Sequence, residues 1–88
     1  MKILRYVKIK NSYGLHARPA AMIAKLLQAF QSKVYFIYLK KIVDARSIMN
    51  ILLLEAPQHS LIQIVVEGED ARETMDKLLE TFEMRFGD

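Results

Sequence analysis

The sequence predicts an α+β fold in which three helices cover one face of a four-stranded sheet. Apolar residues alternate, or cluster with β-branched and aromatic residues, in four short segments, and they recur at helical spacing in three others. The order is strand, helix, strand, strand, helix, strand, helix. A single sheet with every helix on the same side buries each apolar stripe. The 88 residues suffice for one such domain, spanning residues 1–88.

The first four elements follow from local patterns. Residues 2–10 alternate well enough to predict a strand, with Arg5, Val7 and Ile9 on one face. Residues 17–30 predict a helix, because apolar side chains recur at helical spacing. This stripe consists of Ala20, Ile23, Ala24, Leu27 and Phe30. Residues 33–38 and 41–43 predict two more strands, because β-branched and aromatic residues dominate them.

The last three elements also follow from local sequence patterns. Residues 47–54 predict a short helix with Ser47 as its N-cap. Residues 61–67 predict a strand whose alternate apolar residues share one face. A final helix is expected to begin after Asp70, which would cap it. Its apolar stripe consists of Ala71, Met75, Leu78, Leu79 and Phe82.

The composition restricts the classes of site and of compartment. The chain has no cysteine, which excludes a disulfide framework and a thiolate metal site. Its two histidines lack the supporting carboxylates or cysteines of a metal centre. The densest apolar run, residues 51–54, is far too short to span a membrane, and no signal peptide is evident. We therefore expect a soluble cytoplasmic protein without a metal or a cofactor.

The net charge of +3 conceals an uneven distribution. Residues 1–66 carry ten Lys and Arg against two acidic residues, whereas residues 67–88 carry three against eight. A basic body suits an acidic protein partner and speeds encounter with it. Nucleic acid or a membrane surface would also suit the charge, but the basic residues are spread along strands and loops without a motif for either. We expect neither nucleic-acid binding nor membrane insertion.

The segment Gly14-Leu15-His16-Ala17-Arg18-Pro19-Ala20 has the chemistry of a phosphate site. It lies where the first long helix begins, and the first N–H groups of a helix point outward and attract anions. His16 adds a nucleophilic nitrogen, and Arg18 adds a planar fork of donors that matches phosphate oxygens. Pro19 falls in the first turn, where its missing N–H costs nothing. These residues alone leave open that His16 is a surface or capping residue.

The same segment resembles the active site of the HPr family, the histidine phosphocarriers of the bacterial phosphotransferase system. Asp44-Ala45-Arg46-Ser47-Ile48-Met49 is similar to the family's second signature, and Glu67-Gly68-Glu69-Asp70 to the entry of its last helix. Length and spacing fit the family from about Met1 to Phe82. The resemblance implies an open-faced β-sandwich (βαββαβα) with an antiparallel sheet. It also implies the strand order first, fourth, second, third.

The resemblance further implies a phosphoryl relay rather than a free-standing turnover enzyme. His16 would accept a phosphoryl group at Nδ1 from phosphorylated enzyme I and pass it to a IIA protein or domain. Ala17 and Arg18 would bind the phosphate at the helix start. The rival hypothesis is a regulatory module that keeps the HPr fold, works by docking and is switched at Ser47.

Ser47 has two interpretations. Serine at this position routinely caps a helix. The resemblance implies a second role, because HPr kinase phosphorylates the equivalent serine in many relatives. Here Asn50 stands where the family often has glycine. Regulatory phosphorylation and a plain cap both remain open.

Two surfaces are unusually apolar. The short helix of residues 47–54 has apolar residues on all sides, so it is either fully buried or exposes a docking surface around Ile48, Met49 and Leu52. The resemblance implies docking beside the active histidine. On the sheet, Tyr35, Ile37 and Val65 would face away from the helices, so self-association is conceivable there.

The family branch is ambiguous. Residues 51–55 and 82–88 resemble NPr, the carrier of the nitrogen-related branch, whereas Arg46-Ser47-Ile48-Met49 resembles HPr of the sugar-transport branch. The phosphate chemistry rests on His16 and Arg18 in either case. His59 lies in a predicted loop, and we expect no catalytic role for it.

Overall fold

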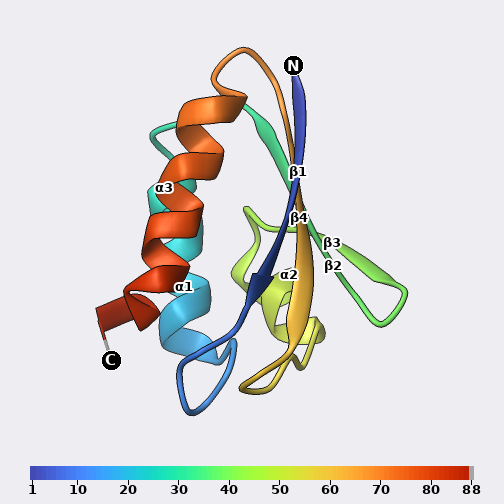
Figure 1. Ribbon diagram of the computed structural model, residues 1–88, viewed down its shortest axis with the longest axis vertical. Helices are drawn as coiled ribbons and strands as arrows, with labels where there is room; N and C mark the ends of the chain where they lie inside the picture. The colour runs from blue at the N-terminus through green and yellow to red at the C-terminus, as the bar shows by residue number, and fades with distance from the viewer. Residues whose placement is uncertain (88) are drawn as a thin grey trace.

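The computed structural model describes residues 1–87, and the predicted elements occur in the predicted order. The strands β1 (Lys2–Lys8), β2 (Lys33–Tyr38), β3 (Lys41–Asp44) and β4 (Leu61–Glu67) form one antiparallel sheet in the order β1-β4-β2-β3. The helices α1 (Ala17–Leu27), α2 (Ile48–Leu53) and α3 (Ala71–Glu83) lie on one face of the sheet (Figure 1), and a short turn, η1 (Arg85–Gly87), follows α3. The expected open-faced sandwich and its strand order are confirmed.

The core lies between the inner face of the sheet and the helices. Alternate residues of β2 and β4 point inward and are buried: Val34, Phe36, Ile62, Ile64 and Val66. The Phe82 ring meets the Phe36 ring edge-on at 6.0 Å between centroids and the Phe86 ring at 4.9 Å. Aromatic pairs in this geometry stabilise by about 0.5–1.5 kcal/mol beyond their area burial. This packing holds η1 against α3.

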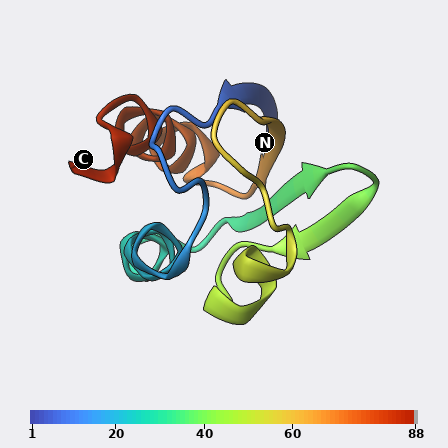
Figure 2. The same cartoon turned by 90° about the horizontal axis from the view of Figure 1, so that it is seen from below.

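The opposite face of the sheet is uncovered, as Figure 2 shows from below. Tyr35, Ile37 and Val65 are half-buried on this face, as predicted. Several neighbouring apolar side chains are exposed there: Leu4, Tyr6, Ile42 and Leu61. Self-association through this face stays a prediction.

No helix within residues 1–87 is both long enough and apolar enough to cross a lipid bilayer.

The largest boundary differences from the predictions are at the ends of β1 and α1; β3 also extends one residue further, to Asp44, and α2 spans Ile48–Leu53 within the predicted residues 47–54. β1 ends at Lys8 rather than residue 10, because the backbone of Ile9 pairs with a loop: its N–H donates to Ser60 O at 2.9 Å, and its carbonyl accepts from His59 N at 2.7 Å. α1 ends at Leu27 rather than at residue 30, and the Phe30 N–H donates to the carbonyl of Leu27 at 3.1 Å in a tighter turn.

Arg46 closes the C-terminal end of α1. Its guanidinium donates to the carbonyls of Leu27 at 2.9 Å, Phe30 at 2.6 Å and Ser32 at 2.9 Å. The last carbonyls of a helix lack partners within the helix and carry the negative end of its dipole, so a cation stabilises them. Arg46 thereby ties α1 to the start of β2.

We expect Arg46→Ala to lower the free energy of unfolding by about 2 kcal/mol, since it removes several charge-assisted hydrogen bonds. A loss of this size lowers the melting temperature by roughly 8–16 °C in a domain this small. Arg72→Ala is the matched control: Arg72 is exposed on α3 and has no side-chain hydrogen bond within residues 1–87. Equal melting temperatures for the two variants would contradict the capping role.

Asp70 occupies the N-cap position of α3 as predicted, but its side chain does not cap that helix. Its carboxylate accepts instead from the amides of Gln31 at 2.9 Å and Ser32 at 3.0 Å, and from the Ser32 hydroxyl. The amides of residues 31 and 32 precede β2, outside the sheet pairing. Asp70 therefore links the start of α3 to the start of β2.

This link predicts a pH-dependent stability. The hydrogen bond from the Ser32 hydroxyl, followed by that from the Gln31 amide, holds the pKa of Asp70 below its usual 3.8. The ionised carboxylate therefore stabilises the fold fully above the unfolded pKa, and this contribution is lost as the pH falls through the folded pKa. Asp70→Asn should lower the melting temperature at neutral pH, and the difference from wild type should shrink well below pH 3.8. Asp76→Asn, on the exposed side of α3, is the control; an Asp70→Asn deficit that is equally large in acid would refute the assignment.

Candidate functional site

His16 is the N-cap of α1. Its backbone is extended, with φ −85° and ψ −169°, and its carbonyl accepts from the Ala20 amide at 3.1 Å. The side chain makes no capping hydrogen bond. His16 therefore occupies the N-cap position through its backbone, without a hydrogen bond from its side chain. The imidazole remains available for chemistry.

The first turn of α1 presents a restricted set of amides. Pro19 has no N–H, and the Ala20 N–H is used by His16 O. The backbone N–H groups of Ala17 and Arg18 precede the hydrogen-bond ladder of the helix, so they point out of its end. They lie directly beside the imidazole in the chain and give this end of α1 the positive potential that a phosphoryl group requires.

The imidazole has two unlike nitrogens. Nε2 is buried and has no hydrogen-bond partner. Nδ1 is not among the buried unpartnered atoms and receives no hydrogen bond within residues 1–87, so it is the nitrogen open to solvent. The Tyr13 ring meets the imidazole edge-on at 5.9 Å between centroids. The geometry therefore offers Nδ1, and not Nε2, to an incoming group.

Arg18 lies against the C-terminal turn. Its guanidinium donates to the Phe86 carbonyl at 2.6 Å, and the same nitrogen lies 3.5 Å from Met22 Sδ. Phe86 and Arg85 adopt left-handed φ angles of 55° and 54°. The sequence pattern predicted Arg18 as a phosphate ligand but gave no sign of Phe86, which is 68 residues away.

A braced loop positions the histidine. Asn11 Nδ2 donates to the Gly14 carbonyl at 2.6 Å, and the Leu15 N–H donates to Ala56 O at 3.0 Å. Gly14 has a φ of +66°, and a Cβ there would collide with the Ala56 carbonyl. Leu15 is buried and pins the loop to the core. Glycine is required at residue 14 for both backbone conformation and space.

The second signature lies on α2. Ser47 is the N-cap of α2, and its hydroxyl accepts from the Asn50 N–H at 3.2 Å, so its capping role is confirmed. Ile48 is 41% exposed and Met49 is 72% exposed, whereas Leu52 is half-buried against the core. Leu53, which the sequence analysis did not single out, is 58% exposed. The helix is thus not fully buried, and its apolar surface is centred on Met49.

His59 serves the loop through its backbone. It is exposed, with a left-handed φ of 75°, and its N–H pairs with Ile9 O. Residues 1–87 contain no cluster of three or more His, Cys, Asp or Glu side chains that could hold a metal ion.

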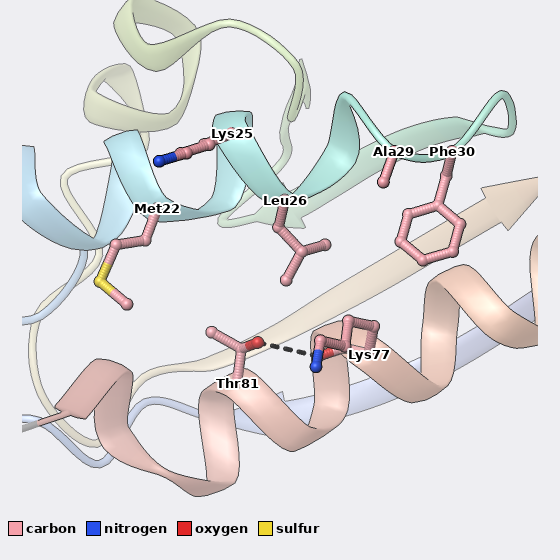
Figure 3. A pocket seen from close by; sticks show the side chains of 7 residues that line it. All are labelled: Met22, Lys25, Leu26, Ala29, Phe30, Lys77 and Thr81. Atoms are coloured by element: carbon pink, nitrogen blue, oxygen red, sulfur yellow. Dashed lines mark hydrogen bonds between the residues drawn. The ribbon is translucent and has the colours of Figure 1, made fainter.

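Away from His16, a groove with a volume of about 600 Å³ lies between α1 and α3 (Figure 3). Its lining is largely apolar and consists of Met22, Lys25, Leu26, Ala29, Phe30, Lys77 and Thr81. The Thr81 hydroxyl donates to the Lys77 carbonyl at 2.9 Å within α3. The lining contains no imidazole and no carboxylate, so this groove is not a phosphoryl-transfer site.

Comparison with known proteins agrees with the family resemblance of the sequence motifs. The family described as "PTS HPr component phosphorylation site" matches residues 3–84. The chain belongs to the HPr family. It is 40% identical over 80 residues to the phosphocarrier protein HPr of Chlamydia trachomatis, covering 91% of this chain and 73% of that protein. It is 38% identical to HPr of Xylella fastidiosa, covering 91% of this chain and 90% of the relative.

Solved HPr structures share the fold. HPr-C-His from Thermoanaerobacter tengcongensis superposes with a TM-score of 0.93 at 35% identity, covering 98% of this chain and 97% of the other. HPr from Bacillus anthracis superposes with a TM-score of 0.85 at 33% identity, covering 90% and 94%. The family membership expected from the motifs is therefore confirmed.

Proposed function

We propose that this HPr-family chain is a cytoplasmic phosphocarrier of the phosphoenolpyruvate-dependent phosphotransferase system. His16 accepts a phosphoryl group from enzyme I and passes it to a IIA protein or domain. The observation that carries the proposal is the solvent-facing Nδ1 of His16 at the N-terminal end of α1. It lies beside the outward-pointing amides of Ala17 and Arg18.

The transfer needs little from the protein beyond position and charge. The Nδ1 lone pair attacks phosphorus, and the bond to the donor breaks with its electron pair remaining on the donor. The proton on Nε2 stays in place, so the ring gains positive charge while the phosphoryl oxygens keep their negative charge. Positioned amides and cations stabilise such a loose transition state. Transfer to the next acceptor reverses these changes.

Arg18 is proposed to bind the phosphoryl group. In this structure the contacts of its guanidinium include a hydrogen bond to the Phe86 carbonyl. A phosphoryl oxygen is a charged acceptor, and charge-assisted hydrogen bonds are roughly twice as strong as neutral ones. A phosphoryl group on His16 therefore adds a strong acceptor for the guanidinium at the start of α1.

The experiment is phosphorylation with enzyme I and phosphoenolpyruvate, followed by intact mass measurement. We expect the mass increase of one phosphoryl group, which acid treatment removes because phosphohistidine is acid-labile. A chain that gains no mass, or gains an acid-stable group, would overturn the proposal. A purified IIA protein added afterwards should remove the label.

We also propose α2 as the partner-docking helix, through Ile48, Met49 and Leu52. Met49→Glu should raise the KM of enzyme I for this chain several-fold, because Met49 is 72% exposed and its apolar contact would be lost.

Ser47→Asp, which imitates a phosphate placed by HPr kinase, should raise the KM most strongly at low salt, where repulsion is least screened. Both variants should melt near wild type. Leu61→Glu, on the uncovered sheet face, is the control; if it raises the KM as much as Met49→Glu, the docking assignment is wrong.

A further inference from the structure

The turn between β2 and β3 is built from unsuitable residues. Tyr38 pairs with Lys41, so Leu39 and Lys40 alone form the turn. Their φ angles are 48° and 68°, both in the left-handed region. Two-residue hairpins with two positive φ angles favour Asn-Gly, because leucine and lysine are strained there. This turn therefore costs folding stability that a common substitution would recover.

The same turn exposes an apolar side chain. Leu39 is 74% exposed, which is among the highest values for a large apolar residue in residues 1–87. The β2–β3 hairpin extends beyond the rest of the sheet (Figure 2), and Leu39 lies in its two-residue turn. Leucine here contributes neither to the core nor to the turn geometry. Residues that break local rules without a folding benefit concentrate at functional sites.

The hairpin is tied to the docking helix. Lys41 Nζ donates to the carbonyl of Leu53 at the end of α2, at 3.2 Å. Leu53 is 58% exposed and Met49 is 72% exposed on that helix. The contact between Lys41 and Leu53 places the hairpin beside the C-terminal end of α2.

The charge of this region selects the kind of partner. Two lysines, Lys40 and Lys41, are exposed beside Leu39, whereas a single acidic residue, Glu55, follows α2. An apolar contact bordered by lysines fits an apolar depression bordered by Asp and Glu.

We infer that Leu39 and Lys40 at the hairpin tip form a second contact for the acidic docking face of enzyme I, in addition to α2. This inference rests on the proposed function. The turn is kept in a strained form because its side chains bind the partner. Stability and docking therefore oppose each other at these two residues.

The test is the double variant Leu39→Asn/Lys40→Gly, which supplies the preferred turn. We expect its melting temperature to rise by roughly 4–8 °C, the shift that about 1 kcal/mol produces in a domain this small. We expect the KM of enzyme I for this chain to rise about threefold to tenfold, with kcat unchanged. Leu39→Ser alone should raise the KM without stabilising the fold. Leu61→Asn, which removes an exposed leucine side chain from the uncovered sheet face, should leave the KM unchanged.

The outcomes separate the two proposals. If wild type accepts phosphate and both Leu39 variants retain its KM, the hairpin contact is refuted while the phosphocarrier function stands. If Leu61→Asn raises the KM as much as the Leu39 variants do, the contact is not specific to the hairpin and the inference is also refuted. If saturating enzyme I fails to label even wild type, the proposed function falls and the inference falls with it.

Discussion

We expect His16→Ala to fold normally and to take up no phosphoryl group from enzyme I. Nδ1 of His16 is the proposed nucleophile at the N-terminal end of α1, and alanine supplies no substitute. The fold should persist because the His16 carbonyl, which Ala20 uses, is retained, and the side chain makes no capping bond. Circular dichroism and thermal melting check the fold, and intact mass after incubation checks the label.

His59→Ala is the matched control for this prediction. His59 is exposed and contributes through its backbone N–H, which alanine keeps. The variant should therefore accept one acid-labile group at close to the wild-type rate. Labelling of His16→Ala to the same extent as His59→Ala would place the acceptor elsewhere.

Arg18→Ala should slow phosphoryl transfer by roughly tenfold to a hundredfold. A charge-assisted contact contributes on the order of 1.5–3 kcal/mol, and that range corresponds to this rate loss when the contact is made in the transition state. The variant also loses the hydrogen bond to the Phe86 carbonyl, so we expect a small loss of stability of about 1 kcal/mol. Rapid-quench labelling at saturating enzyme I measures the rate separately from the melting temperature.

Arg18→Lys distinguishes charge from geometry. Lysine keeps the positive charge but lacks the planar fork, so it should recover only part of the rate. A wild-type rate for Arg18→Ala would show that the amides at the end of α1 suffice without the guanidinium. A full rescue by lysine would show that charge alone matters.

The elements of this fold could be predicted because their signals are local. Period-two and helical spacing identify each strand and helix, and β2 and β4 have the predicted bounds. The strand order was not encoded in that periodicity and came only from the family resemblance. The candidate phosphate site could be proposed from local sequence, because His16, Ala17 and Arg18 lie within one short motif; its role stays a prediction.

The missed features are long-range hydrogen bonds. Arg46 reaches carbonyls 14–19 residues away, Asp70 reaches amides 38 and 39 residues away, and Arg18 reaches Phe86 across 68 residues. Asp70 was expected to cap α3 and instead binds the segment before β2, whereas the distant contacts of Arg46 and Arg18 had no counterpart among the predictions. Local propensity could identify the residues as polar and well placed but could not identify what they bind.

The proline in the first turn of α1 sets how firmly the site can hold its cargo. With no N–H at Pro19 and that of Ala20 engaged, the outward-pointing amides of the first turn are those of Ala17 and Arg18, and Arg18 also carries a cation. A phosphoryl group has three terminal oxygens, so the supply of donors is small and lies on the solvent side. Such a cradle retains the group mainly through a single labile nitrogen–phosphorus bond. A phosphocarrier with so few donors at this site does not bind the phosphoryl group tightly. The group on the histidine therefore stays accessible and reactive toward the next acceptor.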